Sequence, residues 1–277
     1  MVEELGQKTG AWSTTVSYDP IVITSENLKP YDAIVLDSTV GAFLDEAGDQ
    51  AATAERRAAL LAFVRGGKGL VGIHAATDTY HSGMGNTPFT RTPSAPSPSR
   101  GGGGRGGRGT EPAGRGSAPA GGTWPEFNQM IGGIFKNHPW QRVVVKIDDP
   151  GSPLTSMFAT RSFEFQDETY SFFMDSWSRR NLHVLMSIDY AKMSDADKAL
   201  ESNASARTDG DYGLSWIRRD ESGRVFYLAL GHREDGIYRS PEMLRHVLAG
   251  IQYAIGDLKA DDRPSQVGGR LQPGRYF

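Results

Sequence analysis

The chain of 277 residues contains no cysteine, which excludes disulfide bonds, thiolate metal sites and a cysteine nucleophile. It has no run of 18 apolar residues, so we expect no transmembrane helix and no membrane partner. No HxH or HExxH spacing occurs among its six histidines, so no short motif indicates a metal site. The net charge of −3 argues against nucleic-acid binding over the whole surface.

Apolar residues make up 38% of the sequence, enough for the core of one large domain or two small ones. The segment Asp32–Asp37 has a short apolar centre between polar ends, as a buried strand does. A helix is predicted over 50–65, stopped by Gly66, and a second strand over 69–73. Strand, helix and strand at this spacing predict a βαβ unit in a parallel sheet.

The second half of the chain predicts more strands than helices. A short helix is expected from Trp124 to Gly132, and Ser240 with Pro241 supplies the N-cap and first-turn proline of a longer one. Strands are predicted at 142–147, 162–165, 182–187, 213–218 and 224–229.

Residues 83–123 are rich in glycine, arginine, proline and serine and contain almost nothing to bury, so they are predicted to form a disordered insert. Arginine–glycine tracts can bind RNA, but we interpret this one as a solvated loop, because surface loops tolerate long insertions. The chain therefore divides into one domain over 1–257, interrupted by the insert, and a polar tail over 258–277.

The most distinctive segment is Gly67–Asp78, in which an apolar run leads into His74 and small residues follow. This pattern predicts a buried strand that ends in a tight turn with one side chain at its tip. Open α/β sheets bind ligands at the carboxyl ends of their strands. A nucleophile elbow has the same geometry with Ser or Cys at the tip, so an imidazole there restricts the chemistry to acid–base, electrostatic or metal-based. The alternative is a core histidine bonded to backbone.

Four segments in order resemble the motifs of the ThuA-like (trehalose utilisation) family: Gly72–Asp78, Gly132–Pro139, Asp167–Tyr170 and Ala229–His232. The resemblance implies the fold of the class I glutamine amidotransferase-like superfamily, a flavodoxin-like three-layer α/β sandwich with a mostly parallel sheet. In that comparison His74 stands where the amidotransferase cysteine would be, so glutamine hydrolysis through a thioester is excluded. The family implies carbohydrate metabolism, with trehalose-like disaccharides or their 3-keto derivatives as the substrate class.

The start of the chain departs from the flavodoxin-like pattern. Residues Val2–Gly10 read as the end of the first helix, so the opening strand is expected to be missing and to leave unpaired backbone groups in the core. No signal peptide is visible. The sequence as it stands predicts a cytoplasmic protein, and a truncated start would leave a secreted or periplasmic protein open.

Two predicted strands each deliver a histidine to their end, because His232 follows the strand of 224–229 as His74 follows that of 69–73. His138 precedes Pro139, which fixes an extended loop before the strand of 142–147 and presents the ring rigidly. A solvent-exposed turn is the alternative for His138.

A carboxylate completes the set of catalytic candidates, which are His74, His138, Glu168 and His232. Glu168 is a ready general base and shares one side of an extended segment with Tyr170, although an exposed acidic turn is the alternative. The three histidines are also candidate ligands of a divalent metal such as Zn²⁺, the only cofactor that the sequence suggests. Without a metal, a neutral histidine can move protons at a carbon beside a ketone.

Six further residues are predicted to bind the sugar: Thr77, Asp78, Tyr80, Trp124, Tyr170 and Arg233. The aromatic rings can stack on sugar faces, and Asp78 can orient His74 or accept from a hydroxyl. Thr77 and Asp78 could equally cap a helix. The remaining histidines, at positions 81, 183 and 246, are interpreted as structural or surface residues.

These observations favour an enzyme of the lyase, hydrolase or isomerase type that acts on a sugar or keto-sugar by His/Glu acid–base chemistry. A non-catalytic sugar-binding domain on an amidotransferase-like scaffold is the first alternative. An RNA-associated protein that acts through residues 91–115 is the second, and the acidic balance of the rest of the chain argues against it.

Overall fold

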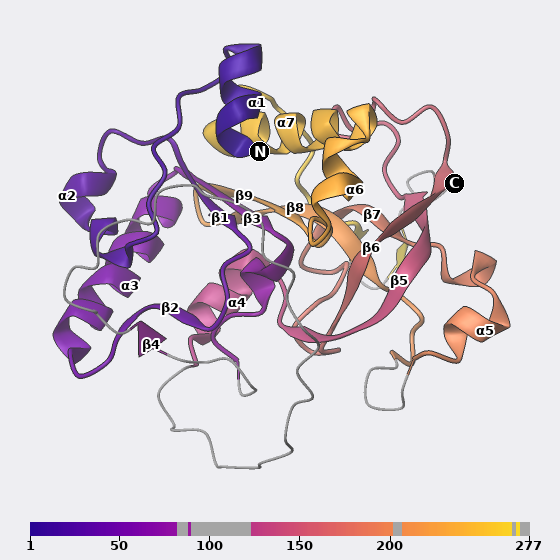
Figure 1. Ribbon diagram of the computed structural model, residues 1–277, viewed down its shortest axis with the longest axis horizontal. Coiled ribbons are helices and arrows are strands. Elements are labelled where there is room, and N and C mark those ends of the chain that lie inside the picture. Colours follow the sequence, from indigo (N-terminus) through magenta and orange to yellow (C-terminus); the bar gives the residue numbers. More distant parts are fainter. Residues whose placement is uncertain (82–87, 90–122, 202–206, 268–269, 272–277) are drawn as a thin grey trace, which may run out of the picture.

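The computed structural model describes residues 1–81, 88–89, 123–201, 207–267 and 270–271. Its centre is a seven-stranded sheet (Figure 1). The strand order across the sheet is β1 (Ala33–Asp37), β3 (Gly69–Ile73), β9 (Gly223–Leu228), β8 (Gly213–Asp220), β7 (His183–Ile188), β5 (Phe135–Ile147) and β6 (Ser162–Phe172).

The sheet is mixed, so the predicted mostly parallel sheet is wrong. Strands β1, β3 and β9 are parallel, whereas β9–β8, β8–β7, β7–β5 and β5–β6 are antiparallel. Parallel neighbours need a long crossover, usually a helix. Among the described residues from β5 to β9, the connections contain nothing longer than the short helices η3 (Tyr190–Lys192) and α5 (Asp195–Lys198). Because β1 pairs directly with β3, the expected gap of unpaired backbone does not arise between them, and the flavodoxin-like strand order is not reproduced.

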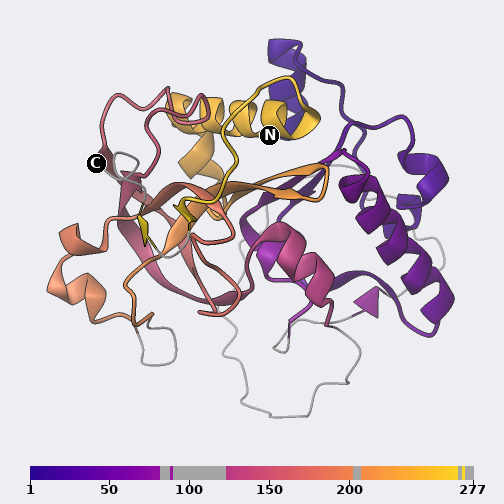
Figure 2. The ribbon, with the colours of Figure 1, turned by 180° about the vertical axis from the view of Figure 1, so that it is seen from behind.

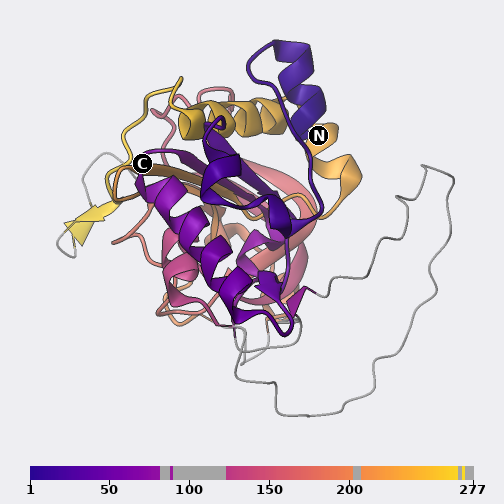
Figure 3. The same cartoon turned by 90° about the vertical axis from the view of Figure 1, so that its left-hand side faces the viewer.

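Helices cover both faces of the sheet (Figures 1 and 2). The helices α3 (Gln50–Arg65) and α4 (Pro125–Ile131) lie on one face, and α7 (Pro241–Ile255) on the other, as the side view also shows (Figure 3). The predicted helix over 50–65 is confirmed, and so is the helix start at Ser240, whose hydroxyl accepts from the Met243 N–H at 3.3 Å.

The other elements have eight residues or fewer. They are α1 (Val2–Thr9), η1 (Pro20–Val22), α2 (Ser25–Leu28), β2 (Ala42–Glu46), η2 (His74–Thr77), β4 (Pro88–Phe89), η3 (Tyr190–Lys192), α5 (Asp195–Lys198), α6 (Glu234–Tyr238), β10 (Gln266–Val267) and β11 (Arg270–Leu271). No helix in the part of the chain that the structure describes is both long and apolar enough to cross a membrane.

Most of the predicted insert over 83–123 lies outside the described residues, apart from β4, which pairs with β2. The described part of the polar tail packs against the sheet. Ser265 is buried, its hydroxyl accepts from the Val184 N–H at 2.8 Å, and its own N–H donates to the Leu182 carbonyl. The beginning of the tail is therefore fastened along β7.

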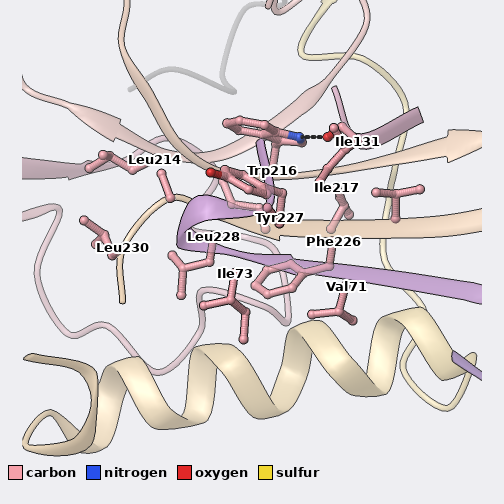
Figure 4. Packing of buried hydrophobic residues seen from close by; sticks show 14 of the residues in the cluster. Val71, Ile73, Ile131, Leu214, Trp216, Ile217, Phe226, Tyr227, Leu228 and Leu230 are labelled. Atoms are coloured by element: carbon pink, nitrogen blue, oxygen red, sulfur yellow. Dashed lines mark hydrogen bonds between the residues drawn. The ribbon is translucent and has the colours of Figure 1, made fainter. Parts of the chain in front are cut away.

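The contact between α7 and the sheet fixes the strands that carry the site. Val71, Ile73, Phe226 and Leu228 face α7 (Figure 4). A Cβ atom added to Gly250 would lie 2.4 Å from the Phe226 ring, so the helix and β9 can approach this closely only with glycine there. On the opposite face Trp216 and Tyr227 stack at 4.4 Å between ring centroids.

The far edge of the sheet curves back over its centre. Strand β5 has three irregularities in its pairing with β6, between residues 135 and 142, and such irregularities bend and twist a strand. As a result Phe172, at the end of β6, contacts Trp216 of β8 and Tyr227 of β9, with ring centroids 5.2 and 6.2 Å apart. An edge strand thereby reaches the carboxyl ends of β3 and β9.

One buried histidine is part of the core. His246, on α7, is fully buried, its Nδ1–H donates to the Leu154 carbonyl at 2.6 Å, and its Nε2 lies 2.9 Å from the Ser215 hydroxyl. Burial disfavours the charged ring and lowers the pKa of His246 to about 4.

We expect this histidine to make the fold sensitive to acid. An unfolded imidazole with its ordinary pKa of 6.5 binds more protons than His246 does in the fold, so stability falls as the pH drops from 6.5 towards 4. Once the pH is below 4, the free energy of unfolding is lower by about 3 kcal/mol for this reason. Urea unfolding at several pH values should show a smaller dependence for His246→Gln than for the wild type. If the free energy of unfolding depends on pH equally in the two proteins, His246 is not the source of the acid sensitivity.

Candidate functional site

His74 sits directly after β3 in a strained backbone conformation, with φ +48°. Residues other than glycine rarely adopt the left-handed region, which costs about 1–3 kcal/mol. Surrounding bonds hold it there. The Tyr227 hydroxyl donates to the His74 carbonyl at 2.5 Å, and the Thr77 hydroxyl donates to Tyr227 at 2.7 Å. The ring is buried, and its Nδ1–H donates to the Ala229 carbonyl at 2.9 Å.

His232 reaches the same place from the neighbouring strand. Strands β3 and β9 are parallel partners, with Ile73 opposite Leu228, so the segments that follow them emerge side by side. The His232 Nδ1 lies 3.2 Å from the His74 Nε2, and the two ring centroids are 5.1 Å apart. The His232 side chain is 57% exposed, so one face of this pair is open to solvent.

Glu168, on β6, contacts three imidazoles with one carboxylate. Its Oε2 lies 3.1 Å from His74 Nε2 and 3.3 Å from His232 Nδ1, and its Oε1 lies 3.3 Å from His138 Nδ1. Burial acts to raise the pKa of Glu168, but the hydrogen bond from His74 and the charges of His138 and His232 outweigh it and bring that pKa below its ordinary value. The carboxylate therefore stays ionised in mildly acidic solution.

His138 belongs to a strand rather than to the loop that Pro139 predicts. It lies in the irregular part of β5, where the ladder to β6 is interrupted, and its ring is parallel to that of Phe135 at 5.9 Å between centroids. Half of its side chain is exposed. Its Nδ1 faces Glu168, and its Nε2 has no hydrogen-bond partner among the described residues.

The structure thus brings the four predicted catalytic residues together, with the carboxylate of Glu168 in contact with His74, His138 and His232. Such a group can exchange protons with a bound ligand through the two exposed imidazoles. It can also hold a cation, because the ligand atoms of His74, Glu168 and His232 all lie within 4.8 Å of one another. His138 is not part of that group of three.

Two of the predicted sugar-binding residues, Tyr170 and Asp78, lie beside this cluster. The centroid of the Tyr170 ring lies 4.5 Å from that of the His74 ring and 4.3 Å from that of the Phe135 ring. Burial, together with the negative charges of Glu168, Asp78 and Asp167, raises the pKa of Tyr170, so its phenol stays protonated. Asp78 pairs with His81 at 2.5 Å, and the His81 ring lies 6.2 Å from Phe135.

The other four predicted sugar-binding residues are not brought into the site. Thr77 is fully buried and supports Tyr227. Tyr80 and Trp124 are core residues that pack edge to face, with their centroids 5.1 Å apart. Arg233 is exposed and pairs with Asp235 at 3.1 Å, although its backbone N–H is held close to the site.

Asp167 is a positioning residue that the sequence does not reveal. It is completely buried, and its carboxylate accepts from three backbone N–H groups, those of Glu168 at 2.8 Å, Gly231 at 2.7 Å and Arg233 at 3.0 Å. It thereby ties β6 to the segment that carries His232. The only signal in the sequence is the pair of neighbouring acidic residues, and only the fold shows which backbone donors they meet.

We expect Asp167→Asn to destabilise the protein by about 1–3 kcal/mol, because the amide replaces one acceptor oxygen with a donor that faces backbone N–H groups. Urea unfolding measures the loss. Asp175→Asn, at an exposed position beyond the end of β6, is the control and should leave stability unchanged. If Asp167→Asn is as stable as the wild type, the three backbone bonds do not hold this segment.

The chain matches the family model described as ThuA, trehalose utilisation, over residues 1–98 and 105–254. Among solved structures it is similar to a putative ThuA-like protein from Bacteroides uniformis, at 18% identity and a TM-score of 0.57, over 91% of this chain and 80% of that one. A putative ThuA-like protein from Parabacteroides merdae has 14% identity and a TM-score of 0.53, over 96% and 85% of the two chains.

A Salmonella typhimurium protein described as cytoplasmic is also similar, at 12% identity and a TM-score of 0.53, over 91% of this chain and 84% of that one. At these identities the three likenesses show the fold alone. No curated protein matches the chain.

Proposed function

The chain belongs to the ThuA trehalose utilisation family, and from this premise we propose that it is an enzyme of carbohydrate metabolism that acts on trehalose-like disaccharides or their 3-keto derivatives. Its ligand is a small sugar, and we place the protein in the cytoplasm. The reaction is acid–base chemistry by Glu168 and the three histidines around it. The observation that carries the proposal is the sharing of one carboxylate by three imidazoles at the carboxyl ends of β3 and β9.

The two exposed imidazoles are suited to proton transfer. His138 and His232 both turn Nδ1 towards Glu168, so a proton held on Nδ1 leaves Nε2 to accept another from a ligand. This arrangement follows the logic of a carboxylate that fixes the tautomer of a catalytic histidine. His74, which is buried and strained, holds Glu168 and is not itself open to a ligand.

A 3-keto sugar gives these groups a proton to move. The ketone at C3 acidifies the hydrogen on C2, and removal of that proton by an imidazole leaves its electron pair on the ketone oxygen as an enolate. The enolate then takes a proton back at C2, which isomerises the sugar. Otherwise it reforms the C3 ketone, the electron pair of the C2=C3 bond moves to form a C1=C2 double bond, and the C1–O bond breaks. The substituent at C1 leaves as an alcohol that takes up a proton, which cleaves the glycosidic bond.

We expect Glu168→Gln to lower kcat/KM for 3-keto-trehalose by about 10²–10⁴-fold, because it loses the charge that orients both exposed imidazoles. His138→Gln and His232→Gln should each lower it as well. The matched control is Glu164→Gln, which lies in the same strand, is exposed and pairs with Arg142. Product formation is followed by chromatography.

If Glu168→Gln turns over 3-keto-trehalose at the wild-type rate, the proposed active site is wrong. Binding of disaccharides without any product, measured by thermal shift, would instead favour a non-catalytic sugar-binding domain on this scaffold.

A further inference from the structure

We propose that His74 Nε2, Glu168 Oε2 and His232 Nδ1 form a binding site for one divalent first-row transition-metal ion, with Zn²⁺ as the ion to test first. The inference names a cofactor of the site described above. It rests on the proposed function only for the role of the ion in catalysis, and not for its binding.

The spacing of the three atoms matches a metal site. They form a nearly equilateral triangle with sides of 3.1 Å from His74 to Glu168, 3.2 Å from His74 to His232 and 3.3 Å from Glu168 to His232. Ligands about 2.0 Å from a tetrahedral zinc ion lie about 3.3 Å from one another. An ion just outside the plane of this triangle therefore meets all three atoms at bonding distance without any movement of the backbone.

The hydrogen bond of His74 shows why a cation belongs there. The Ala229 carbonyl can only accept, so the His74 Nδ1 that faces it carries the hydrogen, and in the neutral ring Nε2 presents a bare lone pair. That nitrogen lies 3.1 Å from a carboxylate oxygen. Two acceptors this close repel each other unless something positive lies between them, which is either a proton on Nε2, as in the hydrogen bond from His74 to Glu168, or a metal ion in its place. Histidine ligands of metals usually donate their other N–H in this way.

The ligands are held in place by groups behind them. The Tyr227 hydroxyl fixes the strained His74 backbone, and the buried Asp167 binds the backbone of Glu168 and the residues on either side of His232. Metal sites depend on such outer partners for the orientation of their ligands. Here one carboxylate orients two of the three ligands.

The donor set also selects the class of ion. Two imidazole nitrogens and one carboxylate oxygen suit Zn²⁺ and its first-row neighbours, whereas Mg²⁺ and Ca²⁺ prefer oxygen ligands alone. Because His232 is 57% exposed, the remaining coordination positions face solvent and can take oxygen atoms of a ligand. When an ion is bound, the His232 Nδ1 is a ligand and carries no proton, so proton transfer falls to His138, whose Nδ1 contacts the other carboxylate oxygen.

The test uses the full chain, freed of metal with EDTA and titrated with Zn²⁺ by calorimetry. We expect one equivalent to bind with Kd at or below about 1 µM, and Mg²⁺ not to bind. Co²⁺ should give the visible absorption of a four- or five-coordinate ion. Glu168→Gln and His232→Ala should each weaken Zn²⁺ binding at least about 10²-fold and abolish the Co²⁺ spectrum.

The matched control is His138→Ala, which removes an imidazole from the same cluster but no ligand, and should bind Zn²⁺ within about threefold of the wild type. Circular dichroism of each variant shows that a lost site is not a lost fold. No binding by the wild type, or equal binding by Glu168→Gln, would overturn the metal site and leave a proton between His74 and Glu168.

Activity separates this inference from the proposed function. If Zn²⁺ binds as expected but no keto-glycoside is turned over, the metal site stands and the proposed reaction fails. If the EDTA-treated protein binds no metal and still turns over the sugar at the full rate, the reaction stands and the metal site fails.

Discussion

The fold around the site depends on one interaction, the sharing of the Glu168 carboxylate by imidazoles from three separate parts of the chain. The carboxylate is 15% exposed, and at this depth attraction between charges is stronger than at the surface. It reaches the ends of the parallel strands because the irregular pairing of β5 with β6 curves this edge of the sheet towards them. Without a negative charge there, the three imidazoles would lose the one group that all of them contact, and only the backbone bonds of His74 and Asp167 would hold the segments around it.

Much of this arrangement could be predicted from the sequence, because the relevant signals are local. The apolar run of 69–73 followed by His74 specifies a strand and a turn, and Ser240 with Pro241 specifies the start of a helix. The pairing direction of β5 to β9 could not be predicted, since it depends on which distant strand each one meets. The role of Asp167 could not be predicted for the same reason, because two of its three backbone partners, the N–H groups of Gly231 and Arg233, lie more than 60 residues away.

The turn at His74 has the geometry in which other α/β proteins present a nucleophile, with an imidazole in its place. A small residue just before His74 allows the strand to pack closely where the turn begins. A Cβ on Gly72 would lie 2.8 Å from the Ile131 side chain and 2.9 Å from the Tyr227 ring, so a larger residue would push the strand away from its support. The turn therefore has a strained backbone, and its chemistry is that of the imidazole of His74.

The two histidines in direct contact are 158 residues apart in the chain, and Glu168 reaches them from the last strand of the sheet. Contacts between such distant residues form late in folding, because the loops that they close are long. The site therefore comes into being only when the sheet is complete, and opening of its outermost strand disperses it while the central core is still intact. The integrity of the site in such an architecture reports on whether the outermost strand of the sheet is in place.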